Sequence, residues 1–361
     1  MAAGRTDVRG SAPGEALLSV RNLEVSFQTY AGEVQAVRDV SFELAPGETL
    51  AVVGESGSGK SVAAKSLMGL LPDNARVKSG EAMFEGHDLL KMSERRMQGI
   101  RGSRISMVFQ DPMTSLDPTM RIGRQLTEGI RKHLGLRGRA ARERAVELLK
   151  AVHIPNAEKR LRQYPHEFSG GMRQRVVIAI ALACDPQVLI CDEPTTALDV
   201  TIQEQILELL AELQERNGTS IILITHDLGV VAQVAHRVAV MYSGRVIETG
   251  TVHDIFGDPK HPYTWGLLTS IPRPDDDRKD DLIPIKGSPP NPLDPPKACP
   301  FSARCDYAMK VCDIEMPAMQ SFGGETDGGY RSASVHQAAC WLHHDLAPNV
   351  EPPARVRGGT R

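Results

Sequence analysis

The stretch Gly54-Glu55-Ser56-Gly57-Ser58-Gly59-Lys60-Ser61 decides how this chain folds. An apolar run rich in β-branched residues, Thr49 to Val53, precedes it, and helix-forming residues from Val62 to Met68 follow. A strand, a glycine-rich turn and a helix form the context in which G-x-x-x-x-G-K-[ST] binds phosphate. A glycine-rich turn without a ligand is the alternative, but the whole pattern and both flanks favour a nucleotide site.

Each part of this stretch has a physical role in phosphate binding. Glycines let the backbone wrap closely around a phosphate, and successive N–H groups with a helix N-terminus supply positive potential. We expect Lys60 to neutralise the outer phosphates and Ser61 to bind Mg²⁺. The expected ATP-binding residues here are Gly54, Glu55, Ser56, Gly57, Ser58, Gly59, Lys60, Ser61 and Val62.

Length and composition limit the class of protein. A chain of 361 residues can build a full core and two or more units. Its net charge of −3 is too small to indicate nucleic-acid binding through bulk electrostatics. No apolar run is long enough to span a membrane, and the N-terminus lacks the build of a signal peptide. Cys184 and Cys191 lie in apolar runs typical of a reduced interior, so we expect a cytoplasmic location.

Strand and helix patterns follow one another along the chain. Residues 1–15 lack periodicity and predict a disordered tail. Alternating apolar residues at 17–27 and 35–44 predict an antiparallel meander, in which Phe27 is a candidate for stacking on adenine or for ordinary packing. Helical patterns dominate from about 113 to 175. The sequence therefore predicts an α/β protein whose mixed central sheet carries an antiparallel β subdomain and a helical insertion.

Polar side chains end three of the predicted buried strands. Gln110 ends the strand from Arg104, Asp192 and Glu193 end the run from Val188, and His226 ends the run from Ser220. Parallel strands deliver such residues to one edge of a sheet, where ligands bind. We expect Asp192 to hold Mg²⁺ and Glu193 to act as the general base on water. Solvated strand ends are the alternative.

A Ser-Gly-Gly sequence, Ser169-Gly170-Gly171, opens a predicted apolar helix. Serine is a good N-cap, and glycines before a helix leave its N–H groups open to an anion. By itself this pattern is also a common loop.

Together these motifs resemble the ATP-binding subunits of ABC transporters, in the family's own order. The resemblance identifies residues 54–61 as the Walker A loop, Gln110 as the Q-loop residue, Asp192 and Glu193 as the Walker B acids, and His226 as the switch histidine. Phe27 falls where the family places its adenine-stacking aromatic, and Gln110 is implied as an Mg²⁺ ligand. The implied catalytic residues are Glu193, His226, Gln110 and Lys60.

The resemblance also implies a dimer of cassettes. Ser169, Gly170 and Gly171 match the family's signature loop, and Ala197-Leu198-Asp199 matches its D-loop. In this family these loops contact the ATP held by a second cassette, so Ser169, Gly170, Gly171 and Asp199 are expected to bind ATP in trans. The signature departs from the commonest form, because Phe168 replaces a leucine and Met172 a glutamine. The serine and both glycines remain, so we expect activity to survive.

Two further stretches look like the peptide/nickel importer subfamily. These are Phe109 to Pro118 and His261 to Leu268 followed by Ile271-Pro272. The implied substrates are di- or oligopeptides, with nickel chelates, glutathione or opine-like compounds as alternatives. The implied partners are a second ATPase subunit, favoured to be a paralogue, two transmembrane permeases and an extracytoplasmic solute-binding protein, with no nucleic acid. The chain would then sit on the cytoplasmic face of the membrane.

Four cysteines lie beyond a proline-rich linker, Pro284 to Pro296. Cys299, Cys305, Cys312 and Cys340 have the spacing C-x5-C-x6-C, then 27 residues, then C. A short module with little apolar material is often held together by a metal. Four thiolates suit Zn²⁺ or a [4Fe–4S] cluster, and the lack of a C-x2-C pair favours the cluster. Uncoordinated or disulfide-bonded thiols remain open.

These patterns predict the domain organisation. We expect a disordered tail at 1–15, an ABC ATPase domain at 16–258 with its helical subdomain at 113–175, a cysteine-containing extension at 259–346 and a disordered end at 347–361. The leading hypothesis is the ATPase motor of a peptide importer. A soluble ABC ATPase acting on nucleic acid and a non-catalytic regulatory cassette are the alternatives. Intact Lys60, Asp192, Glu193 and His226 oppose the regulatory cassette.

Overall fold

The computed structural model describes residues 16–196, 198–271, 284–323 and 335–357. Its centre is an eight-stranded sheet in the order β11-β12-β10-β9-β3-β8-β7-β6. The strands β9, β3, β8, β7 and β6 run parallel, and β10, β12 and β11 extend them as antiparallel neighbours. Their bounds are β3 Thr49–Val53, β6 Ile105–Val108, β7 Val188–Asp192, β8 Ser220–Thr225, β9 Arg237–Tyr242, β10 Arg245–Thr251, β11 Gln320–Phe322 and β12 His336–Ala338.

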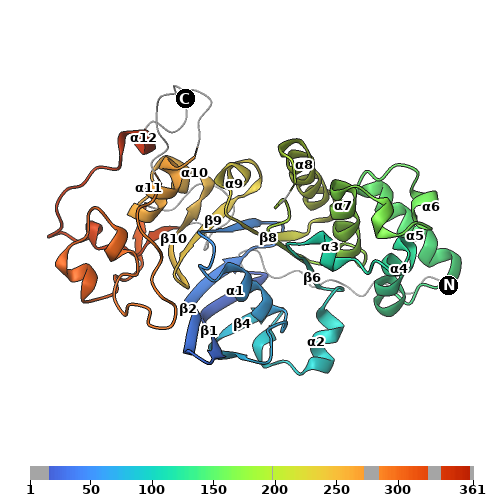
Figure 1. Cartoon of the computed structure of the whole chain (residues 1–361), viewed down its shortest axis with the longest axis horizontal. Coiled ribbons are helices and arrows are strands. Elements are labelled where there is room, and N and C mark those ends of the chain that lie inside the picture. Colours follow the sequence, from blue (N-terminus) through green and yellow to red (C-terminus); the bar gives the residue numbers. More distant parts are fainter. Residues whose placement is uncertain (1–15, 197, 272–283, 324–334, 358–361) are drawn as a thin grey trace.

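A second, antiparallel sheet in the order β2-β1-β4-β5 lies below the main sheet in Figure 1. Its bounds are β1 Leu18–Thr29, β2 Gly32–Leu44, β4 Ala75–Phe84 and β5 His87–Asp88. The expected meander is only partly correct, because β1 pairs with β2 on one side and with β4 on the other. The segment that brings β4 back to β1 includes the glycine-rich stretch itself. The two sheets are therefore interleaved in the chain.

Helices cover the main sheet and extend it on one side. The helix α1 Lys60–Leu67 follows the glycine-rich stretch, and α2 Glu94–Ile100 precedes β6. The helical unit at the right of Figure 1 is the expected insertion. It contains α3 Pro112–Ser115, α4 Ile122–His133, α5 Gly138–Ala151, α6 Ala157–Arg160 and α7 Gly170–Ala181. The remaining helices are α8 Val200–Asn217, α9 Leu228–Val234, α10 Val252–Gly257, α11 Pro262–Thr269 and α12 Ala354–Arg357.

The two faces of the sheet carry different cores. Along β7, Leu189 and Cys191 pack with α5, α7 and α8, whereas Val188 and Ile190 pack with α1 and β1. Successive side chains of a strand point to opposite faces. It follows that α1 and α7 lie on opposite faces of the sheet. In the described ranges, no helix is long and apolar enough to cross a membrane.

A third core joins the C-terminal extension to the sheet. Tyr242 and Val240 of β9 pack with Phe301, Cys299 and Cys312. The extension therefore shares a core with one apolar face of the sheet. The expected disordered end at 347–361 is wrong in part: α12 forms there, and its Val356 is buried in the same core. The expected tail at 1–15 lies outside the described residues.

Candidate functional site

The glycine-rich stretch forms a tight loop between β3 and α1, as the sequence predicts. Gly54 has a φ of 153°, and a Cβ there would lie 2.1 Å from the Met241 carbonyl oxygen. Gly59 has a φ of 100°, and its Cβ would lie 2.4 Å from the Ala36 carbonyl oxygen. Side chains cannot enter such spaces, so both positions require glycine. The close packing of β2 and β9 around the loop fixes its shape.

Lys60 turns back into this loop. Its Nζ donates to the carbonyl oxygens of Gly54 at 2.7 Å and Glu55 at 2.9 Å, and to Ser58 Oγ at 3.3 Å. Burial lowers the pKa of Lys60, while the neighbouring Glu193, Asp192 and Glu55 carboxylates oppose that shift. A buried ammonium ringed by loop carbonyls is positioned to accept an anionic ligand in the loop.

Ser61 and Asp192 bring two oxygen donors together beside the loop. Ser61 Oγ donates to Asp192 Oδ1 at 2.6 Å, although 131 positions separate the two residues in the sequence. Burial raises the pKa of Asp192, and the hydrogen bond from Ser61 and the charge of Lys65 oppose the rise. A buried carboxylate next to a hydroxyl is the oxygen donor set that Mg²⁺ prefers, so these residues fit the ion.

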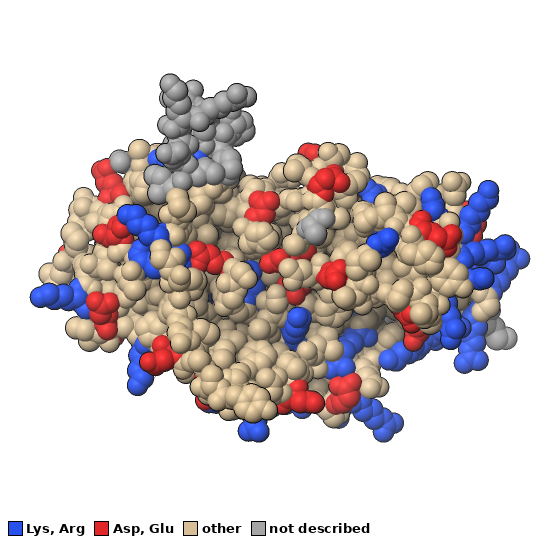
Figure 2. Space-filling model, viewed as in Figure 1, with Lys and Arg blue, Asp and Glu red and all other residues tan. Residues whose placement is uncertain are grey.

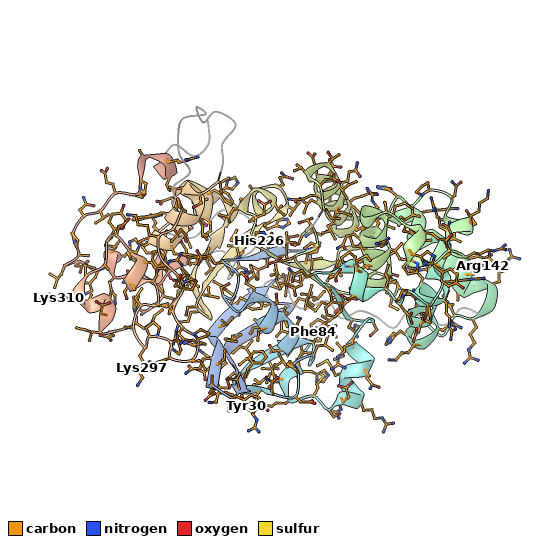
Figure 3. All side chains as sticks on the ribbon, in the orientation of Figure 1. Tyr30, Phe84, Arg142, His226, Lys297 and Lys310 are labelled. Atoms are coloured by element: carbon orange, nitrogen blue, oxygen red, sulfur yellow. The ribbon has the colours of Figure 1, made fainter. Side chains whose placement is uncertain are left out.

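Glu193 is the point where three loops meet. Its carboxylate accepts from Gln110 Nε2 and from Thr196 Oγ1, each at 2.9 Å, and lies 3.3 Å from His226 Nδ1. The strands β6, β7 and β8 are adjacent and parallel, so their C-terminal ends deliver these residues to one edge. Figure 3 places His226 near the middle of the molecule. We call Gln110, Asp192, Glu193, Thr196 and His226 the ATP edge.

The backbone at Glu193 has left-handed geometry, with a φ of 48°. Its N–H donates to the Ile224 carbonyl oxygen of β8 at 2.9 Å, which holds the residue against the sheet. A glutamate with positive φ is uncommon and costs conformational energy. That geometry turns the side chain away from the strand direction and toward Gln110 and His226.

The Ser-Gly-Gly loop lies away from the glycine-rich loop. Ser169 caps α7 by accepting from Met172 N at 3.4 Å, as the sequence predicts. The glycines do not precede the helix, because α7 begins at Gly170. Since α7 and α1 cover opposite faces of the sheet, this chain's own Ser169 is not part of the cradle around Lys60. Ser169 and Gly170 are exposed to solvent.

Three further expected ATP contacts, Phe27, Asp199 and Val62, also stay predictions. Phe27 is half-buried near the end of β1, with Val34 of β2 as its register partner. Asp199 caps α8 by accepting from Ile202 N at 3.0 Å, and its neighbour Ala197 lies outside the described residues. Val62 lies on α1 and packs against the core around β1.

Sequence reasoning missed several residues at this site. Thr196 follows the two acids and contacts Glu193, but a threonine in a loop carries no motif by itself. Tyr263 OH accepts from Glu55 N at 2.9 Å, and Arg304 makes two bonds to the Glu55 carboxylate, at 2.7 and 3.0 Å. Separations of more than 200 positions hide these contacts from any local pattern.

All four C-terminal cysteines are free thiols; Cys299 and Cys312 lie in the third core, Cys305 packs against it, and Cys340 is buried. Burial raises the pKa of Cys340 to about 12, and nearby Cys299, Cys305 and Cys312 add to the rise. The backbone N–H of Cys299 donates to the Cys312 carbonyl oxygen at 3.1 Å. Across the described residues, no group of three or more His, Cys, Asp or Glu side chains is arranged to hold a metal ion. The alternative of disulfide-bonded thiols is wrong for these four residues.

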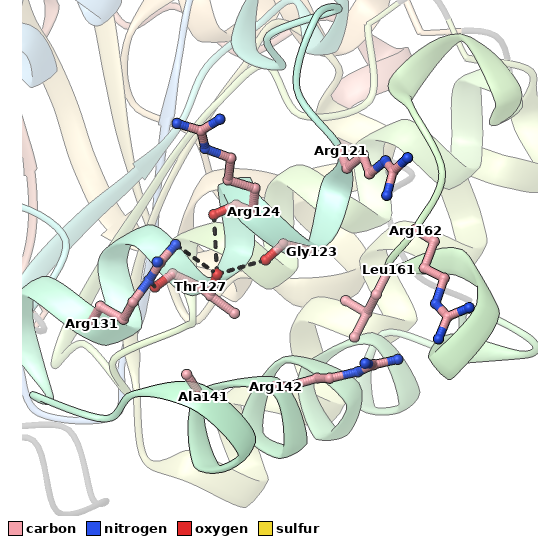
Figure 4. Close-up of a pocket in the computed structure, with 10 residues that line it drawn as sticks. Arg121, Gly123, Arg124, Thr127, Arg131, Ala141, Arg142, Leu161 and Arg162 are labelled. Atoms are coloured by element: carbon pink, nitrogen blue, oxygen red, sulfur yellow. Dashed lines mark hydrogen bonds between the residues drawn. The ribbon is translucent and has the colours of Figure 1, made fainter.

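A cavity of about 360 Å³ lies between α4 and α5, apart from the ATP edge (Figure 4). Lys and Arg side chains gather at this outer end of the helical unit (Figure 2). Ten residues line the cavity, and none is acidic: Arg121, Gly123, Arg124, Thr127, Arg131, Gly138, Ala141, Arg142, Leu161 and Arg162. None of the expected ATP-binding residues is among them.

Comparison with protein families gives two matches. Residues 37–196 match the model described as "ABC transporter", and residues 247–312 match "Oligopeptide/dipeptide transporter, C-terminal region". The first match contains the glycine-rich loop and both acids of the ATP edge. The second contains three of the four cysteines.

Curated relatives resemble the chain over nearly its whole length. The oligopeptide transport ATP-binding protein OppD of Bacillus subtilis is 56% identical over 346 residues, which are 96% of this chain and 94% of that protein. The dipeptide transport ATP-binding protein DppD of Lactococcus lactis is 55% identical over 95% of each chain. Among solved structures, a dimeric ATP-binding cassette in a post-hydrolysis state with ADP and Pi matches with a TM-score of 0.59 and 28% identity, over 65% of this chain and 98% of that one.

Proposed function

The chain belongs to the ABC transporter family of ATPases, and we propose that it is the motor subunit of an importer for di- or oligopeptides. Two observations support the proposal. The polar side chains at the ends of β6, β7 and β8 converge on Glu193 beside the Ser61–Asp192 pair. Relatives named for oligopeptide and dipeptide transport match nearly the whole chain.

We propose the following roles at the ATP site. Lys60 and the N–H groups of residues 54–62 bind the phosphates, and Phe27 stacks on the adenine. Glu193 accepts a proton from the attacking water as general base, while Gln110 and His226 orient the water and the γ-phosphate. The three contacts that Glu193 makes in the structure support this assignment, because they fix the carboxylate beside the phosphate loop.

Mg²⁺ fits the Ser61–Asp192 pair, with Gln110 as a further proposed ligand. The ion would supply positive charge that offsets the charge developing on the transferred phosphoryl group. In this chain the hydroxyl of Ser61 and the carboxylate of Asp192 already lie 2.6 Å apart. Placing these donors in advance reduces the reorganisation that binding requires.

We infer that the chain works as a pair of cassettes. Ser169, Gly170, Gly171 and Asp199 would contact ATP held by the partner, which is favoured to be a paralogue. The exposure of Ser169 and the opposite placement of α7 and α1 support a contact in trans. A Cβ at Gly171 would lie 2.7 Å from Ile202 Cγ2, so the loop is held closely on α8. ATP binding would then favour the closed pair.

We propose that the chain lies on the cytoplasmic face of the membrane, where two permeases attach it. An extracytoplasmic solute-binding protein would select the cargo. Nickel chelates, glutathione or another small solute are the second candidate for that cargo.

We further propose a nucleotide-binding domain at 16–258 and an extension at 259–346. The match of residues 247–312 to the transporter C-terminal region supports a C-terminal extension, and it begins within β10, before the proposed boundary.

Reconstitution tests the proposed transport. We expect the chain to co-purify with its two permeases, and the complex in liposomes to take up a labelled dipeptide only with Mg·ATP. Lys60→Ala should abolish uptake by weakening nucleotide binding. A nickel chelate or glutathione that is transported in place of the peptide would correct the cargo. Failure to bind any permease, together with ATPase activity stimulated by DNA or RNA, would overturn the motor role.

We also propose that Cys299, Cys305, Cys312 and Cys340 bind a [4Fe–4S] cluster, with Zn²⁺ as the alternative. Mutual proximity of the four thiols, and the burial of Cys299, Cys312 and Cys340, support a shared ligand. A single zinc ion needs sulfurs about 2.3 Å from one metal. A cluster holds its thiolates farther apart, because iron and sulfide lie between them. The sequence spacing, which lacks a C-x2-C pair, favours the cluster over zinc.

Anaerobic purification of the full chain tests this second proposal. We expect iron and sulfide in the protein and visible absorbance, and both should be lost in Cys312→Ser. Cys184→Ser is the matched control, since Cys184 is also buried but lies in the core around α7. Zinc without sulfide would establish the alternative. Protein without iron, sulfide or zinc would contradict metal binding altogether.

A further inference from the structure

Arg304 connects the cysteine-containing extension to the phosphate loop. All five of its N–H donors have acceptors in the structure. Nη1 donates to Glu55 Oε2 at 2.7 Å and to Tyr242 OH at 3.1 Å, and Nη2 donates to Glu55 Oε1 at 3.0 Å. The remaining bonds go to the carbonyl oxygens of Lys286 and Ile285. The Arg304 side chain is 5% exposed and that of Glu55 is 28% exposed, so this is a partly buried, bidentate ion pair.

Glu55 is the second residue of the phosphate loop, and it is fixed at two points. Arg304 holds its carboxylate, and Tyr263 OH accepts from its N–H at 2.9 Å. Its carbonyl oxygen accepts from Lys60 Nζ at 2.9 Å. The conformation of residue 55 therefore determines where the carbonyl oxygen that holds Lys60 lies.

The charge of Glu55 also bears on ATP binding. A carboxylate in a loop that receives phosphates repels them, and partial burial strengthens the repulsion relative to bulk water. Glu55 is near enough to raise the pKa of Lys60. The guanidinium of Arg304 neutralises that carboxylate from the side of the loop that faces the extension, and so leaves the positive charge of Lys60 available for the ligand.

The position of Arg304 depends on the cysteine segment. Arg304 ends a short 3₁₀ turn, Ser302–Arg304, that lies between Cys299 and Cys305. The Arg304 guanidinium lies 5.7 Å from the Tyr242 ring centre and 5.9 Å from that of Phe301, which packs against Tyr263. The C-terminal extension, drawn in orange-red in Figure 1, thus reaches the loop through an arginine next to a cysteine.

We propose that Arg304 is a positioning residue for ATP binding, which presents a neutralised, fixed Glu55 in the phosphate loop. The inference rests on the proposed nucleotide site at residues 54–62. It also means that order in the cysteine segment determines how well the loop binds phosphate. Disorder around Cys299 and Cys305 would release Arg304, and the uncompensated Glu55 carboxylate would then weaken ATP binding.

Equilibrium binding of Mg·ATP and steady-state ATPase rates of the full chain test the proposal. Arg304→Gln should raise the Kd for Mg·ATP about tenfold, the effect of losing one charge-assisted contact. The rate at saturating ATP should stay within about twofold, because the residue acts on binding equally in the ground and transition states. Arg304→Lys should give an intermediate Kd, since it keeps the charge and loses the bidentate geometry.

A double-mutant cycle separates positioning from general stability. In a Glu55→Gln background, Arg304→Gln should change the Kd by less than about twofold, because the charge that it neutralises is gone. Lys286→Gln is the matched control: it removes an exposed ion pair with Asp306 in the same segment and should leave the Kd unchanged. Thermal unfolding identifies variants that do not fold. If Arg304→Gln is one of them, the Kd of Glu55→Gln for Mg·ATP tests the proposal instead.

Three outcomes decide between the inferences. Lys60→Ala with wild-type affinity would contradict the proposed nucleotide site itself. If Lys60→Ala loses binding while folded Arg304→Gln binds like the wild type, only the positioning role is wrong. Additive effects of Arg304→Gln and Glu55→Gln would likewise overturn it, because a shared electrostatic contact must be non-additive.

Discussion

Glu193 follows β7 and Glu248 lies within β10, so the same eight-stranded sheet carries two functionally different carboxylates. Glu193 is 15% exposed and contacts three side chains from three loops. Glu248 is fully buried and accepts from the N–H groups of Lys260 and His261, from Thr264 Oγ1 and from His336. We call Glu248 and these four partners the Glu248 cluster.

The nature of the partners explains the difference. Two backbone N–H groups cannot leave Glu248 unless the segment before α11 unfolds, so this carboxylate stabilises the junction between the sheet and the extension. The partners of Glu193 are side chains with rotamer freedom, and His226 is 59% exposed. They can exchange partners when a nucleotide arrives. The contrast fits the proposed role of Glu193 as a general base and a stabilising role for Glu248.

The same chemical change at the two positions should give opposite results. Glu193→Gln should lower ATP turnover about a thousandfold, because the amide cannot accept the proton of water. Mg·ATP binding and the free energy of unfolding should stay near the wild type, within about 1 kcal/mol. Steady-state ATPase rates and urea unfolding measure the two quantities. Turnover close to the wild type would refute the general-base role.

Glu248→Gln should instead destabilise the fold by about 2–3 kcal/mol, because an amide cannot accept all four hydrogen bonds and leaves buried donors unpaired. Turnover per folded molecule should change little. Urea unfolding and active-site titration are the measurements. Glu215→Gln, on an exposed part of α8, is the control that should change neither quantity. A stable but inactive Glu248→Gln would place this residue in the ATPase machinery and remove the contrast.

His226→Ala tests the exchangeable character of the ATP edge. The described structure gives His226 an ion pair with the Glu193 carboxylate. Its loss should lower turnover by about a hundredfold, less than the loss of the base itself, and leave the unfolding free energy unchanged. In the double variant with Glu193→Gln, the second change should add almost nothing, because both residues act on one water. Full additivity of the two rate effects would instead show that His226 and Glu193 act independently.

The ATP edge was predictable from sequence because its parts are local. Each residue ends an apolar strand, and parallel strands gather their ends at one edge. The glycine-rich loop likewise carries its function within eight consecutive positions. Thr196 was not predicted, because nothing in the local sequence distinguishes it from other loop threonines.

The C-terminal extension was not predictable in the same way. Glu248 lies in an ordinary alternating strand, and its partner His336 is 88 positions away. Arg304 and Glu55 are 249 positions apart. The low apolar content of the extension predicts a core too small to stand alone. Only the fold shows that Tyr242, Tyr263 and Phe301 form one core with the sheet.

His261 gives an effect that develops only in acid, and it reports on the Glu248 cluster by itself. Its Nδ1 accepts from Tyr263 N at 3.0 Å and so caps α11. Burial lowers the pKa of His261 to about 3, and the nearby His343 lowers it further. In the unfolded chain the His261 imidazole binds a proton near pH 6.5, whereas in the folded protein it stays neutral at that pH. The contribution of His261 to the free energy of unfolding is therefore complete above pH 6.5. It falls by up to about 1.4 kcal/mol per pH unit as the pH drops toward 3.

His261→Asn should remove this contribution to the pH dependence while keeping an acceptor for the helix cap. Urea unfolding between pH 7 and pH 4.5 measures the slope, and exposed His253→Asn is the control that should keep it. The expected result is a less stable variant at neutral pH, because the smaller side chain leaves space, with a shallower loss of stability in acid. If the slope persisted, the proton would be taken up elsewhere in the cluster. A changed ATPase rate at constant stability would instead show that the cluster and the ATP edge are coupled, which the separation between Glu248 and Glu193 argues against.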